Sequence, residues 1–189
     1  MYDLGPSARH LARLVRDVRD DQLAAPTPCP AYSVADLLDH VQTLAVGFAR
    51  AARRRTTGSA GPPVPAGAHL RDGWRDDIPA LLDDLAAAWS EPGAFEGETE
   101  IAGFRAPAPA ICSVAANELV VHGWDLARAT GQVPGADASG LEAARPFADQ
   151  LGPAGSPLRS GGGFGDPVTA TAIRSSTSSC GNPGNSEAT

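Results

Sequence analysis

The sequence predicts an all-α protein, a bundle of four substantial helices with a long crossover, a shorter extra helix and an irregular C-terminal tail. Apolar residues recur at three- and four-residue spacing in four segments that glycine- and proline-rich stretches separate. Aromatic residues make up only 5% of the chain, while alanine, leucine and arginine are abundant. No segment shows the pattern of a parallel sheet, so a helical bundle is the expected architecture.

The first helix is expected over residues 6–22. Its apolar residues follow helical spacing, and Pro6 stands where a first helical turn accepts proline. The run 24–30 contains three prolines, which end the helix and extend the chain.

The second helix has the clearest signals. Ser33 is placed as an N-cap, and Asp36 occupies the position of a capping-box acid. An amphipathic stripe then runs to about Arg55. Residues 56–68 are rich in glycine and proline and predict a flexible crossover.

A third helix is expected between Trp74 and Trp89, kinked or restarted at Pro79. Residues 91–106 show weak alternation, which would suit a short extended pair.

The fourth helix follows Pro107 and stops around Gly131, a residue type that commonly terminates helices. A shorter fifth helix is expected after Asp137. Its predicted buried face is Leu141, Ala144, Phe147, Ala148 and Leu151. Residues 1–152 are thus expected to form a metal-binding bundle domain, and residues 153–189 a largely disordered Gly/Pro/Ser-rich tail.

Composition and charge restrict the function. A net charge of −7 argues against nucleic acid as a partner, because a phosphate backbone needs a positive surface. No apolar window is long enough for a membrane span, and the N-terminus does not resemble a secretory signal. The three cysteines are widely spaced, which indicates no disulfide framework or cysteine zinc site. The expected location is the cytoplasm.

Glu118 and His122 stand four residues apart in the fourth helix, on the face expected to point into the core. An unpaired carboxylate in that position would cost several kcal/mol or take up a proton. A bound metal ion would compensate. The alternative is an ordinary helix pair, with the histidine bonded to a carbonyl.

His40 in the second helix is the candidate third ligand. Two imidazoles and one carboxylate suit zinc with an open fourth position, and they also suit iron, nickel or manganese. Asp36 and Asp125 are candidate outer-shell partners that would orient an imidazole. Cys29, before the second helix, is either an activated thiol or a small buried hydrophobe.

Two stretches carry a family resemblance. Residues 27–41 read TPCPAYSVADLLDHV, which resembles the TPCPxWTVxDLLxH signature of the actinobacterial mycothiol-dependent maleylpyruvate isomerase-like family. Residues 118–132 read ELVVHGWDLARATGQ and resemble its second signature. The family belongs to the DinB/YfiT-like superfamily, and the resemblance extends from residue 1 to about 165.

The resemblance implies a four-helix bundle that binds a divalent metal, usually zinc, through positions matching His40, Glu118 and His122. It also implies mycothiol as a thiol cosubstrate, a small electrophile as the partner, and a homodimer by analogy. Isomerisation would proceed by addition of the thiolate to a cis double bond, rotation and elimination.

The resemblance implies that the isomerase itself carries a second, C-terminal domain, and a chain of 189 residues is expected to be too short to contain it. The expected function is therefore metal-dependent isomerisation or S-transfer. The alternatives are a non-catalytic bundle that binds metal or thiol and a hydrolase of thiol conjugates.

Overall fold

A computed structural model describes residues 2–29, 31–55 and 64–151 of the chain. The helices and strands, in chain order, are α1 (Gly5–Arg16), α2 (Val34–Ala52), α3 (Trp74–Ser90), β1 (Glu98–Ile101), β2 (Phe104–Pro107), α4 (Ala108–Thr130) and α5 (Ala138–Leu151). The all-α prediction is confirmed, with the addition of a two-stranded sheet. The predicted tail, 153–189, and residues 56–63 of the crossover lie outside the described residues.

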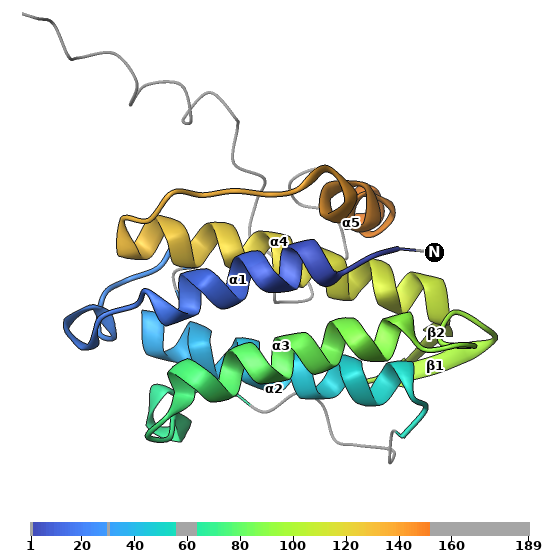
Figure 1. The fold of residues 1–189 in the computed structure, drawn as a ribbon, viewed down its shortest axis with the longest axis horizontal. Coiled ribbons are helices and arrows are strands. Elements are labelled where there is room, and N and C mark those ends of the chain that lie inside the picture. The colour runs from blue at the N-terminus through green and yellow to red at the C-terminus, as the bar shows by residue number, and fades with distance from the viewer. Residues whose placement is uncertain (1, 30, 56–63, 152–189) are drawn as a thin grey trace, which may run out of the picture. The chain divides into compact units, whose positions relative to one another are not determined.

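The four long helices close into a ring. Helix α1 packs against α3 and α4, and α2 packs against the same two helices (Figure 1). Helices α1 and α2 are therefore diagonal partners, as are α3 and α4. This arrangement brings the facing sides of α2 and α4 together along the bundle, and these two helices carry the candidate ligands.

Apolar side chains from all four helices form one core. The largest fully buried ones are Trp89, Leu4, Leu11, Leu37, Leu38, Ile78, Leu82, Leu85, Ile111, Leu126, Val15 and Val18. Helix α4 is buried around most of its circumference, since α1, α2 and the hairpin all contact it. Polar groups on α4 are thus largely removed from water.

The start of α2 is fixed by the predicted capping box. The Ser33 hydroxyl accepts a hydrogen bond from the Asp36 backbone N–H, and the Asp36 carboxylate accepts one from the Ser33 N–H. These bonds satisfy backbone donors that the first helical turn leaves unpaired. The cap sets the helical phase that turns His40 toward α4.

The first helix is shorter than the sequence predicted. It ends at Arg16, and the chain forms a 3₁₀ turn at Asp20–Gln22 instead of continuing to residue 22. Arg75 of α3 donates two hydrogen bonds to the Val18 carbonyl and pairs with Asp20. The Val18 carbonyl, which would accept a backbone hydrogen bond if the helix continued to residue 22, is therefore bound by the Arg75 side chain instead.

A kink or a restart was predicted at Pro79, and the restart is wrong, because α3 is one continuous helix through this residue. The short extended pair predicted within residues 91–106 is confirmed. Strands β1 and β2 are antiparallel, with Ile101 opposite Phe104. Ala102 and Gly103 form the turn and both have positive φ, which matches the twist of a two-residue hairpin. The Thr99 hydroxyl donates a hydrogen bond to the Ala51 carbonyl and ties the hairpin to the end of α2.

The fifth helix was placed correctly, but part of its predicted buried face was wrong. Leu141 is 51% exposed and Ala148 is also exposed, whereas Ala143 and Ala144 are buried. The Asp137 carboxylate accepts a hydrogen bond from the Ser7 hydroxyl of α1, and the Phe147 N–H donates one to the Ser113 hydroxyl of α4. These polar contacts fix the rotation of the helix.

Candidate metal centre

The structure brings the three predicted ligands together. His40 projects from the middle of α2, and Glu118 and His122 project from successive turns of α4. One ligand atom from each residue can be chosen so that all three lie within 4.8 Å of one another. Of the side chains, 18% of His40, 12% of His122 and 11% of Glu118 is exposed. The group is nearly buried and is most accessible at His40.

The Glu118 carboxylate is shared between the imidazoles. Its Oε2 atom lies 2.8 Å from Nε2 of His122 and 3.7 Å from Nε2 of His40. The imidazole rings meet edge to face, with centroids 4.9 Å apart. Two imidazole nitrogens and one carboxylate oxygen thus converge, which is a donor set that fits a divalent cation.

The protonation of the group follows from its contacts. Burial opposes ionisation of Glu118, but the close contact with His122 and the nearby imidazole of His40 outweigh it and hold the pKa of this carboxyl well below its usual range. Burial disfavours the imidazolium of His122, yet hydrogen bonds to Asp125 and Glu118 raise the pKa of this imidazole. In the absence of a metal, a proton on His122 therefore compensates the buried carboxylate.

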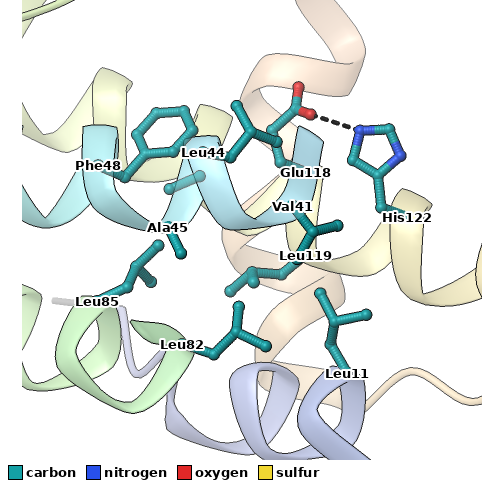
Figure 2. Close-up of a pocket in the computed structure, with 11 residues that line it drawn as sticks. Leu11, Val41, Leu44, Ala45, Phe48, Leu82, Leu85, Glu118, Leu119 and His122 are labelled. Carbon is teal, nitrogen blue, oxygen red and sulfur yellow. Dashed lines mark ion pairs between the residues drawn. The ribbon is translucent and has the colours of Figure 1, made fainter. Parts of the chain in front are cut away.

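Aliphatic side chains cover the inner side of the group. Figure 2 shows the carboxylate of Glu118 and the ring of His122 at the edge of a small apolar cavity in the bundle. The cavity has room for about one water molecule. Its apolar lining includes Leu11, Val41, Leu44, Phe48, Leu82, Leu85 and Leu119. A reagent larger than water must therefore approach from outside the bundle.

The two candidate outer-shell acids behave differently. The Asp125 carboxylate lies 3.3 Å from Nδ1 of His122, which leaves Nε2 directed at Glu118. Within the described residues, the Asp36 carboxylate bonds Ser33 and the Gly67 N–H and has no imidazole partner. Asp125 therefore fits an orienting role, and Asp36 is a helix cap instead.

A buried aspartate next to His40 was not anticipated. Asp39 is 5% exposed, and its carboxylate accepts a hydrogen bond from the Ala66 N–H and pairs with Nδ1 of His69. His69 directly follows residues 56–68, which the sequence predicts to be a flexible crossover. Together with the bond from Gly67 to Asp36, these contacts hold the end of the crossover against the ligand-bearing helix.

Tyr32 was also missed. Its ring packs against His40, with centroids 5.5 Å apart and planes tilted by 51°. Burial raises the pKa of the Tyr32 phenol, and the charges of Cys29, Glu118 and Asp36 add to this effect. The phenol thus lies within electrostatic reach of the Glu118 carboxylate. An aromatic residue in a proline-rich motif just before the ligand helix was the available signal.

The two cysteines in the described part of the chain add no ligand to the group. Cys29 and Cys112 are free thiols, and Cys112 is completely buried. Burial raises the pKa of the Cys112 thiol to about 12, so it stays protonated and unreactive at neutral pH. Among the described residues, the only cluster with metal-ligating geometry is His40, Glu118 and His122.

Comparison with known families agrees with this geometry. The family model for the mycothiol maleylpyruvate isomerase N-terminal domain matches residues 4–127. The chain belongs to this family. The matched region contains all three candidate ligands, the capping box of α2 and Tyr32. The resemblance seen in the two sequence signatures is thereby confirmed.

Two relatives from a curated collection of sequences are each described as an uncharacterized protein. Two proteins from different strains of Mycobacterium tuberculosis are 30% identical over 126 residues, which is 64% of this chain and 62% of each relative. The chain thus spans less than two thirds of the length of these relatives. No solved structure matches it. No helix in the described ranges is long and apolar enough to cross a membrane.

Proposed function

We propose that the protein is a cytoplasmic enzyme that holds a divalent metal through His40, Glu118 and His122. It uses this metal with a low-molecular-weight thiol, mycothiol, either to isomerise a small electrophile or to attach the thiol to it as a thioether (S-transfer). Zinc is the expected metal. The proposal rests above all on the convergence of three ligand atoms from two helices within 4.8 Å. Membership of the mycothiol maleylpyruvate isomerase N-terminal domain family supports the choice of thiol.

The fold prepares the ligands for this role. The Asp125 carboxylate lies where it can accept a hydrogen bond from Nδ1–H of His122, and in this tautomer Nε2 is the nitrogen that would bind a metal. The cap at Ser33 and the contacts of Asp39 hold the part of α2 that precedes His40. Little rearrangement would therefore be needed on metal binding.

The charge of the ligand set favours an anionic cosubstrate. Two neutral imidazoles and one carboxylate leave one positive charge of a divalent ion uncompensated. When bound, such an ion lowers the pKa of a thiol and stabilises its thiolate. Apolar side chains such as Leu44 and Leu119 keep bulk water from the inner side, and the low polarity there strengthens these electrostatic interactions.

Product analysis tests the proposed reaction. Zinc-loaded protein is incubated with mycothiol and a panel of small electrophiles that includes cis-enoyl acids. Isomerisation yields the trans product and leaves the thiol concentration unchanged, while S-transfer consumes one thiol for each thioether formed. The His122→Ala variant should be inactive in both assays.

Other products would point to other functions. Release of an amine or acid from a thiol conjugate would indicate a hydrolase. Thiol binding without turnover of any electrophile would indicate a non-catalytic binding module. Either result would contradict the proposed activity.

A further inference from the structure

The segment before α2 is a closed turn that presents Tyr32. The Tyr32 N–H donates to the Cys29 carbonyl, and the Thr27 N–H donates back to the Tyr32 carbonyl. The Thr27 hydroxyl contacts both carbonyls at 2.9 Å and accepts a hydrogen bond from the Cys29 N–H. Thr27, Cys29 and Tyr32 are thus linked by two backbone hydrogen bonds and by the contacts of the Thr27 hydroxyl, which is more than a simple connection between helices requires. The turn holds the Tyr32 backbone in one position.

This position places an aromatic ring on the accessible edge of the candidate metal centre. The Tyr32 ring packs on His40, which is the most exposed of the three candidate ligands. The inner side of the group is closed, since the apolar cavity beside Glu118 has room for only about one water molecule. A thiol that reaches the group must therefore pass the edge where Tyr32 lies.

The Tyr32 hydroxyl is available to a ligand. No other residue of the described chain hydrogen-bonds with it, although the residue is half-buried. Buried or half-buried tyrosines usually direct the O–H group to a partner. A phenol is protonated at neutral pH and can donate to an anion, whereas a phenylalanine would give the same ring packing without a donor.

We infer that Tyr32 is a ligand-binding residue whose phenol donates a hydrogen bond to the sulfur of the thiol cosubstrate. The inference rests on the proposed function. The thiol loses its proton to solvent when it binds beside His40, and the phenol O–H then faces an anionic sulfur. Hydrogen bonds to charged acceptors are stronger than those to neutral ones, so Tyr32 would favour the thiolate over the neutral thiol.

Cobalt(II) gives a readout that is independent of turnover. Cobalt(II)-loaded protein is titrated with mycothiol and with 2-mercaptoethanol between pH 6 and 9, and thiol binding is followed by absorption. Tyr32→Phe removes the donor and keeps the ring, Tyr32→Trp keeps a ring and supplies an indole N–H, and Cys29→Ser is a control in the same turn. Affinity for cobalt(II) is measured for every variant.

We expect that thiol affinity falls only in Tyr32→Phe, the variant that lacks a hydrogen-bond donor at this position. Tyr32→Phe should bind both thiols about tenfold more weakly, with thiol binding shifted to higher pH. Tyr32→Trp should bind more tightly than Tyr32→Phe, and Cys29→Ser should match the wild type. Cobalt(II) affinity should be the same in all four proteins.

Three results would overturn the inference. Equal thiol affinity of Tyr32→Phe and the wild type would show that the phenol makes no such bond. Equal losses in Tyr32→Phe and Cys29→Ser would show a structural effect of the turn. A wild-type protein that binds cobalt(II) without binding thiol would refute the proposed function itself, and the role of Tyr32 would fall with it.

Discussion

Replacing Asp125 by asparagine should weaken metal binding while it preserves the bundle. The change keeps the shape of the side chain but removes the negative charge of the carboxylate that contacts Nδ1 of His122. Loss of such an outer-shell partner typically lowers metal affinity 10- to 100-fold. The separation of 3.3 Å is at the long end for a hydrogen bond, which favours the lower limit. We therefore expect a loss of about tenfold, or about 1.4 kcal/mol.

Asp36→Asn is the matched control for this prediction. Asp36 is also an aspartate near His40 in the sequence, but its carboxylate bonds Ser33 and Gly67. This substitution should cost about 1 kcal/mol of folding free energy through the weakened cap and leave metal affinity unchanged.

Competition with a chromophoric zinc chelator measures affinity, and urea denaturation of the metal-free proteins measures stability. The orienting role of Asp125 would be refuted if Asp125→Asn bound zinc as tightly as the wild type. It would also be refuted if both variants lost affinity equally.

Three further predictions concern stability, measured by urea denaturation of the metal-free protein. The pKa of His122, raised from 6.5 to about 9, contributes stability that is fully present below pH 6.5 and lost as the pH rises through 9. The pKa of Glu118 is lowered from 4.5 to about 2, so its contribution to stability is present above pH 4.5 and is lost as the pH falls through 2. The free energy of unfolding should therefore be highest between pH 4.5 and 6.5, where both contributions are present. If the dependence of the free energy of unfolding on pH were the same in His122→Gln as in the wild type, this prediction would be wrong. Gly67→Ala would place a Cβ atom 2.5 Å from that of Ala35 and should cost about 1–3 kcal/mol, whereas a neutral effect would show that the crossover end is not docked on α2. Gly131→Ala forces alanine to φ of +72° at the end of α4 and should cost about 1 kcal/mol, with no loss if the helix ends elsewhere.

The bundle could be predicted because local signals and burial agreed. The stripe of α2, the box at Ser33 and Asp36 and the glycine after α4 each follow from short-range physics, and each is present in the structure. The end of α1 could not be predicted in this way. It depends on Arg75, which is more than fifty residues away and takes the Val18 carbonyl.

The candidate ligands could be proposed from the sequence for a related reason. A carboxylate and an imidazole on the core face of α4 need a partner, and His40 was the histidine on a neighbouring amphipathic helix. The sequence could not show which aspartate contacts a ligand histidine, because Asp36 and Asp125 stand at similar spacings from a histidine. The difference comes from the Gly67 N–H at the end of the crossover, which the fold brings to Asp36.

Tyr32 and Asp39 escaped prediction because their roles depend on how a turn and a crossover fold back. The prolines around Cys29 indicate an irregular segment, but they do not indicate that the ring of Tyr32 at its end packs against His40. Asp39 reads as an ordinary polar residue of a helix, and its burial follows only when residues 66–69 cover it.

Anomalous diffraction from crystals of metal-loaded protein tests the central claim most directly. We expect one peak per chain at the absorption edge of the bound metal, about 2.0–2.2 Å from Nε2 of His40, a Glu118 carboxylate oxygen and Nε2 of His122. Crystals of His122→Ala should lack this peak. The absence of a peak between α2 and α4 in the wild type, or a peak held by other residues, would contradict the assignment of these three residues as a metal centre.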